Sequence, residues 1–216
     1  MRHRVFTFIT ILTIIHFLIV SCSLQGQPVE TGLEMLAISK FEILKGKKVE
    51  LITNPTGVNR NLQSCIDLIF NAPGIMLTAL YSPEHGVRGE YTAGEIIGST
   101  TDPSTGLPVY SLYGDTRKPT KEMLEGIDVL VYDIQDIGSR SYTYISTLGL
   151  AMEAAAENNI PFIVLDRPNP LGGVRMEGPL VQKDFISFVS TPYWIYGQKT
   201  FPLSGKKHNF ISYIDY

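Results

Sequence analysis

The chain has 216 residues and a formal net charge of −3, and 44% of its residues are hydrophobic while 18% are charged. This length and composition suit one well-packed domain, and the lack of a basic run argues against a nucleic-acid partner. His85 and His208 do not have metal-ligand spacing, and Cys65 lies among apolar neighbours. We therefore expect no metal, no cofactor and a buried thiol.

The first 22 residues have the pattern of a lipoprotein signal peptide. A basic start precedes an almost wholly apolar run from Val5 to Val20, and Ile19-Val20-Ser21-Cys22 resembles a bacterial lipobox. The apolar run of about 16 residues is shorter than the roughly 20 that span a bilayer, which favours a signal peptide over an uncleaved anchor. We expect an exported, periplasmic lipoprotein held on the membrane by a lipid on Cys22, with residues 23–43 as a linker or N-terminal segment.

Four short apolar runs alternate with helical patterns over residues 44–190, the expected catalytic domain. The strand-like runs are 49–53, 75–81, 129–132 and 161–165, and apolar residues recur at helical spacing over 62–70 and 144–155. Buried strands separated by helices predict an α/β domain with a Rossmann-like parallel sheet covered by helices on both faces. The Gly- and Pro-rich stretch 92–121 is expected to run over the sheet rather than form another βα unit.

Polar segments follow each of the four predicted strands, at 54–57, 82–89, 133–140 and 166–173. The carboxyl ends of parallel strands open onto one edge of the sheet, where ligands bind, and the amino ends of these strands carry plainer residues. The segments do not match a nucleotide-binding glycine pattern. We therefore predict a functional site on this rim, with substrate-binding candidates at Asn54, His85, Arg88, Arg140, Tyr142 and Asn169.

Glu84 is the first candidate for a catalytic group. Pro83 and Gly86 fix the turn that carries it, and a carboxyl group shielded by apolar surface has a raised pKa that suits a general acid. The alternative is a carboxylate bound by backbone amides at the start of a helix. Asp133 and Asp136 are candidates for a second catalytic carboxylate. They are three positions apart in a turn, so we expect at most one to face the cleft and the other to stabilise the turn.

The arginines of the rim are suited to holding an anionic substrate. A guanidinium group binds a carboxylate through two hydrogen bonds, which makes Arg88 and Arg140 candidates for that task. The alternative is a salt bridge to Asp133 or Asp136 that braces two loops, and both roles are compatible because an arginine has five donors.

The remaining candidates have equally plain alternatives. His85 either orients Glu84 or bonds a sugar hydroxyl, or is a structural loop histidine. Tyr142 can stack on a sugar ring, whereas Tyr144 lies on the apolar side of its helix and is expected in the core. Asn169, in a stiff segment with two prolines, is expected to contact the ligand.

Taken together, these motifs resemble the exo-β-N-acetylmuramidase family, glycoside hydrolases that act in peptidoglycan recycling. The resemblance runs from about residue 44 to about 190 and rests on Asn54-Pro55-Thr56-Gly57, Ser82-Pro83-Glu84-His85-Gly86, Tyr113-Gly114, Asp133-Ile134-Gln135-Asp136-Ile137-Gly138-Ser139-Arg140 and Asp166-Arg167-Pro168-Asn169-Pro170-Leu171-Gly172-Gly173. It implies an N-terminal Rossmann-like catalytic domain in which the family's essential glutamate falls on Glu84. It also implies release of N-acetylmuramic acid from the non-reducing ends of peptidoglycan fragments, whose lactyl carboxylate suits the rim arginines.

The chain departs from the family pattern at its C-terminal end. Family members are about twice as long and carry a smaller C-terminal domain over the cleft, whereas residues 191–216 form an atypical tail without helical or strand period from Gln198. We expect a truncated or frameshifted chain, so the resemblance does not by itself predict that this form is active. The competing interpretations are a non-catalytic periplasmic lipoprotein that binds muropeptides or sugars, and a degenerate fragment that neither folds well nor functions.

Overall fold

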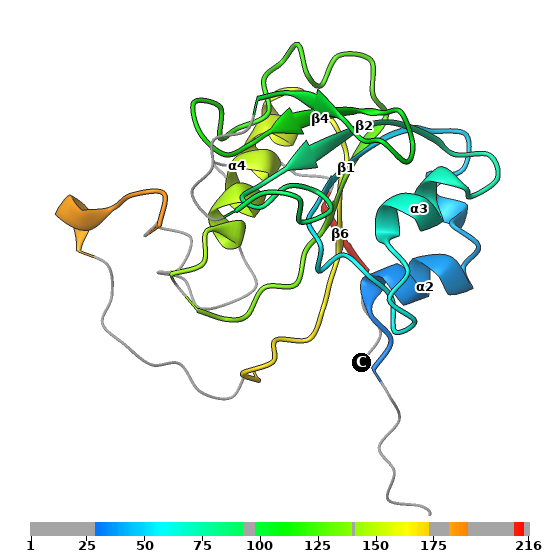
Figure 1. The fold of residues 1–216 in the computed structure, drawn as a ribbon, viewed down its shortest axis with the longest axis horizontal. Helices are drawn as coiled ribbons and strands as arrows, with labels where there is room; N and C mark the ends of the chain where they lie inside the picture. The colour runs from blue at the N-terminus through cyan, green and yellow to red at the C-terminus, as the bar shows by residue number, and fades with distance from the viewer. Residues whose placement is uncertain (1–28, 93–97, 140, 173–181, 190–209, 214–216) are drawn as a thin grey trace, which may run out of the picture.

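The structure is a computed structural model that describes residues 29–92, 98–139, 141–172, 182–189 and 210–213. Within these residues, seven strands form one sheet in the order β3-β4-β2-β1-β5-β6-β7 (Figure 1). The neighbouring strands are parallel, except that β3 and β4 are antiparallel. The strands are β1 (Lys48–Thr53), β2 (Met76–Ser82), β3 (Thr100–Thr101), β4 (Pro108–Ser111), β5 (Val129–Asp133), β6 (Phe162–Leu165) and β7 (Phe210–Tyr213).

Helices cover both faces of this sheet, as the apolar strand runs predict. Figure 1 shows α2 (Gly32–Ile38) and α3 (Cys65–Phe70) on one face and α4 (Tyr144–Glu157) on the other. Successive residues of β1 point to opposite faces. Val49 and Leu51 belong to the core under α2 and α3, and Ile52 belongs to the core under α4. The predicted parallel α/β sheet is therefore confirmed. Two short 3-10 helices complete the described elements, η1 (Glu42–Leu44) and η2 (Lys183–Phe185).

The N-terminal segment from Thr31 is part of the folded domain. Thr31 and Glu34 form a capping box that satisfies free amide groups at the start of α2. Leu33 and Leu36 of this helix are fully buried in the core. Gly32 lies so close to β6 that an added Cβ would be 2.5 Å from the backbone nitrogen of Asp166. Of the two expectations for residues 23–43, the part that contains α2 fits an N-terminal segment of the domain and not a linker.

Three strands, β3, β4 and β7, lie where the sequence pattern indicates no regular structure. The segment 92–121 was expected only to cross the sheet, but its β4 pairs in parallel with β2 and extends the sheet. The tail was expected to lack a strand, but its β7 pairs in parallel with β6. The proposed signal peptide and Cys22 lie outside the described residues. In the part of the chain that the structure describes, α4 and the shorter helices all fall below the length and apolarity needed to cross a membrane.

Candidate active site

The four polar segments predicted to share a rim do follow strands that end at one edge of the sheet. Thr53 at the end of β1 is level with Asp133 at the end of β5, and β2 and β6 run in the same direction beside them. The chain goes from β1 to α3 on one face, and from β5 to α4 on the other. The rim between β1 and β5 is therefore a topological switch point, where open α/β sheets bind their ligands.

Glu84 lies at this rim among side chains from three other segments. A hydrogen bond to the Glu84 carboxylate raises the pKa of the Tyr113 hydroxyl, which follows β4. Burial raises the pKa of Tyr144 at the start of α4, the negative charge of Glu84 adds to this, and a hydrogen bond from Asn54 opposes it. Glu84, Tyr113 and Tyr144 are each half-buried, so the cluster is shielded without being closed.

An exposed aromatic ring lies beside this cluster. Tyr142 is 46% exposed, and its ring centroid is 6.5 Å from that of Tyr144 at an interplanar angle of 53°. Tyr144 packs partly against the core, as predicted, but its hydroxyl group also forms a hydrogen bond with the Asn54 side chain. Its contribution to the rim was missed because the apolar spacing of the helix describes the ring and not the hydroxyl group.

Asn54 connects the loop after β1 to the loop after β5. Its side chain is buried, and its Oδ1 accepts hydrogen bonds from the backbone nitrogen and the hydroxyl group of Thr56 at 3.0 and 2.5 Å. The Thr56 hydroxyl in turn accepts from the backbone nitrogen of Gln135 at 2.9 Å. The Gln135 amide donates to the carbonyl of Pro168 at 3.0 Å, so three rim loops are joined. Thr56 and Gln135 were not among the predicted residues.

Asp133 is fully buried in an ion pair with Arg167. Nε of Arg167 donates to Oδ1 of Asp133 at 2.7 Å, and Nη2 donates to Oδ2 at 3.0 Å. Nη1 of Arg167 also donates to the carbonyl of Val58 at 2.9 Å. Burial raises the pKa of Asp133 and the guanidinium group opposes that shift. Because both carboxylate oxygens are bonded to an internal partner, we assign Asp133 a structural role instead of the predicted catalytic one.

Asp136 forms the predicted turn but retains one free oxygen. Its Oδ1 accepts from the backbone nitrogen of Gly138 at 2.6 Å, whereas Oδ2 is buried and has no hydrogen-bond partner among the described residues. Burial raises the pKa of this carboxyl group. Asn169 lies against the same turn, since a Cβ on Gly138 would be 2.6 Å from the Asn169 amide. Arg140 lies outside the described residues, and the binding roles of Arg140 and Asn169 stay predictions.

Arg88 does not pair with either aspartate named from the sequence. It forms ion pairs with Asp102 in the segment before β4 and with Asp67 on α3. His85, which precedes it, is half-buried and has a backbone φ of 77°, a left-handed conformation that is uncommon for a residue other than glycine. Within the described residues, His, Cys, Asp and Glu side chains do not form a group of three or more that could hold a metal ion.

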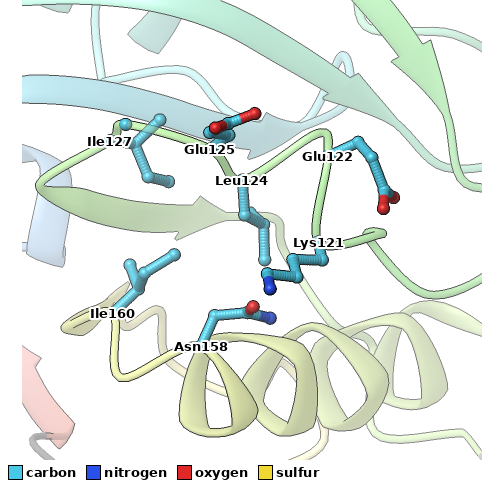
Figure 2. A pocket seen from close by; sticks show the side chains of 8 residues that line it. Lys121, Glu122, Leu124, Glu125, Ile127, Asn158 and Ile160 are labelled. Atoms are coloured by element: carbon cyan, nitrogen blue, oxygen red, sulfur yellow. The ribbon is translucent and has the colours of Figure 1, made fainter.

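A separate hollow of about 370 Å³ lies at the opposite end of the strands from the Glu84 rim. Figure 2 shows Leu124, Ile127 and Ile160 lining it together with Lys121 and Asn158. These residues come just before β5 and just before β6, at the amino ends of the strands. The hollow is therefore distinct from the Glu84 rim.

The sheet and its rim define an α/β protein with a carboxylate-bearing site at the switch point. Residues 49–197 match the family described as exo-beta-N-acetylmuramidase NamZ, N-terminal, and the chain belongs to this family. It is 56% identical over 161 residues to the peptidoglycan beta-N-acetylmuramidase NamZ of Bacillus subtilis. That match covers 74% of this chain and 39% of the relative. The resemblance inferred from the rim motifs is thus confirmed.

Solved structures agree with this assignment. A crystal structure of a DUF1343 family protein from Bacteroides fragilis has a TM-score of 0.74 and 52% identity, covering 85% of this chain and 49% of the other. A second DUF1343 family protein from the same organism has a TM-score of 0.64 and 34% identity, covering 76% and 42%. This chain therefore spans less than half the length of the relatives that it matches.

Proposed function

We propose that this chain is the glutamate-bearing part of an exo-acting glycosidase that releases N-acetylmuramic acid from the non-reducing ends of peptidoglycan fragments. The observation that carries the proposal is the cluster of Glu84, Tyr113, Tyr144 and Asn54 at the switch point of the sheet. The 56% identity to a peptidoglycan β-N-acetylmuramidase supports the substrate class.

Glu84 is proposed to protonate the glycosidic oxygen as the bond to the leaving group breaks. The Tyr113 hydroxyl fixes the orientation of the Glu84 carboxyl group and stabilises the carboxylate that remains after proton transfer. Because these side chains are half-buried, bulk water screens the interaction between the Glu84 carboxylate and the Tyr113 hydroxyl less strongly.

The second catalytic role is proposed for Asp136 and not for Asp133. Both oxygens of Asp133 bond to Arg167, whereas Oδ2 of Asp136 has no partner among the described residues. Asp136 would act on water, on the sugar or on the substrate's own acetamide group, which are the routes that this chemistry allows. The exposed ring of Tyr142 would provide a stacking face for the sugar.

The proposed setting is the periplasmic side of a membrane, with the chain attached through a lipid on Cys22. The support for this setting is the basic start, the short apolar run and the lipobox-like Ile19-Val20-Ser21-Cys22. Labelling cells with an alkyne fatty acid and comparing the natural chain with a Cys22→Ser variant tests it. Equal labelling of both would contradict the lipid anchor.

The enzymatic proposal is tested by replacing Glu84 with glutamine in the full chain. Release of N-acetylmuramic acid from a chromogenic muramic-acid glycoside is expected to fall by about 100-fold or more, the usual contribution of general acid catalysis. Glu125→Gln is the matched control, because Glu125 lies at the opposite edge of the sheet. Near-normal turnover by Glu84→Gln would contradict the assignment. Calorimetric binding of a muramic-acid disaccharide without product would instead identify a binding protein.

A further inference from the structure

The loop that carries Glu84 has a strained backbone. His85, Gly86 and Gly89 have φ values of 77°, 83° and 81°. A left-handed conformation at a residue other than glycine is unfavourable and persists only where the surrounding structure enforces it. Two backbone–backbone hydrogen bonds of the loop, from Gly86 to Pro83 and from Tyr91 to His85, are long at 3.4 Å, while the Arg88 backbone nitrogen donates to Oε2 of Glu90 at 2.9 Å. Contacts with other elements therefore help to hold the left-handed conformation of His85.

Arg88 supplies a connection from this loop to two other elements. Its Nε and Nη2 donate to the two carboxylate oxygens of Asp102 at 2.5 and 3.0 Å. Its Nη2 and Nη1 donate to Asp67 on α3 at 2.8 and 3.4 Å. The Asp102 side chain is fully buried and also accepts two hydrogen bonds from Thr105. Four of the five guanidinium hydrogens are thus used internally.

The side chains of Arg88 and Glu84 interact with different elements. Arg88 forms an ion pair with Asp67 on α3, whereas the negative charge of Glu84 helps to raise the pKa of Tyr144 at the start of α4. These two helices cover opposite faces of the sheet (Figure 1). A guanidinium group held against α3 is poorly placed to grip a substrate that contacts Glu84.

We infer that Arg88 is a positioning residue: its ion pairs with Asp102 and Asp67 hold the strained loop that aims Glu84, and it does not bind the substrate carboxylate. The inference about Glu84 rests on the proposed function. Gly89 fits the same arrangement, since a Cβ there would be 2.8 Å from the Pro55 side chain of the neighbouring rim loop. A loop released from Arg88 would lose this close approach to the loop after β1.

Hydrogen exchange of the full chain, followed by mass spectrometry, tests the positioning role without requiring activity. In Arg88→Gln, amides of residues 84–91 are expected to exchange about tenfold faster or more, because a hydrogen bond to a charged group commonly contributes at least that factor. Amides of β1 and β5 report on global unfolding and are expected to stay protected. Arg60→Gln is the matched control, since Arg60 is also bonded to two carboxylates, of Glu30 and Glu34.

Asp67→Asn is the second variant, because it leaves the buried Asp102 paired. It is expected to accelerate exchange in residues 84–91 by less than Arg88→Gln does. Unchanged exchange of this loop in both Arg88→Gln and Asp67→Asn would overturn the inference. Equally fast exchange of residues 84–91 in the Arg60→Gln variant would overturn it as well, because the effect would then not be specific to Arg88.

Kinetics separate positioning from substrate contact. Positioning predicts that Arg88→Gln lowers kcat by about 100-fold with KM nearly unchanged, because misplacing a catalytic group affects the transition state alone. Contact with the lactyl carboxylate predicts a higher KM for a muramic-acid glycoside but not for the matching N-acetylglucosaminide, and that result would refute positioning. If the natural chain hydrolyses neither substrate, the proposed function fails for this chain, while the exchange experiment still decides the role of Arg88.

Discussion

Glu50 is an acidic side chain in the middle of the central strand β1, and it makes the stability of the domain depend on pH. Its side chain is 4% exposed and bonds to Tyr81, which belongs to the core under α4. The Tyr81 hydroxyl donates to its Oε2 at 2.6 Å and also to the carbonyl of Met123 at 3.1 Å. Burial raises the pKa of Glu50 to about 7, and the bond from Tyr81 only partly opposes this.

The folded protein therefore binds a proton at Glu50 more tightly than the unfolded chain does. This contribution to stability is fully present below the ordinary pKa of 4.5 and is lost as the pH rises through about 7. With 1.36 kcal/mol for each unit of pKa difference, ionisation of Glu50 in the folded state is expected to lower the free energy of unfolding by about 3 kcal/mol. Most of that loss falls between about pH 5 and pH 8.

Glu50→Gln is the matched variant, because glutamine has the same size, cannot ionise and still offers an oxygen to Tyr81. Urea unfolding followed by circular dichroism at several values between about pH 5 and pH 8 measures the free energy for both proteins. The natural chain is expected to lose about 2.5 kcal/mol more than the variant over this range. Other titrating groups, including the buried Asp133, are common to both and cancel in the difference. Parallel pH profiles would refute the reasoning.

Two further substitutions test how the domain and its rim are held together. Arg167→Leu leaves the fully buried Asp133 without a partner and is expected to lower the free energy of unfolding by about 3–5 kcal/mol, whereas adding Asp133→Asn should recover part of that loss. Urea unfolding measures the free energy of unfolding of the single and the double variant, and a double variant as unstable as the single one would argue against the ion pair. Gly32→Ala places a Cβ 2.5–2.6 Å from backbone atoms of Asp166 and Leu165 at the end of β6 and is expected to cost about 1–3 kcal/mol. Gly98→Ala, where open space surrounds the Cβ, is the control in a thermal unfolding series, and equal losses would contradict the packing argument.

The sheet could be predicted because its central strands are buried on both faces. Such strands appear as continuous apolar runs, and β1, β2, β5 and β6 lie within about two residues of the predicted ranges. Strand β4, next to the edge strand β3, lacks that signal, since its residues Pro108–Ser111 include polar and half-buried positions. The short α2 was missed although Thr31 and Glu34 have the spacing of a capping box, which is the signal that would have found it.

The rim could be located from sequence, but its pairings could not. Parallel topology alone brings the carboxyl ends of the strands together, and this places Glu84 and Asn54 near each other. The choice of ion-pair partners depends on the register of segments far apart in the chain. Arg88 finds Asp102 because β4 lies beside β2, and the sequence pattern assigned no strand to that segment. Composition identifies which residues can form ion pairs, while the order of the strands in the sheet decides which ones meet.

These pairings divide the rim into two separately supported parts. Arg167 joins the loop after β6 to Asp133 at the end of β5 and to Val58 in the loop after β1. Arg88 ties the Glu84 loop to α3 and to the segment before β4 instead. The two parts meet where Glu84 approaches side chains of the first part, so the position of the acid relative to its neighbours depends on both arginines at once. A change in either ion pair is therefore expected to alter the site without touching any group that contacts the sugar.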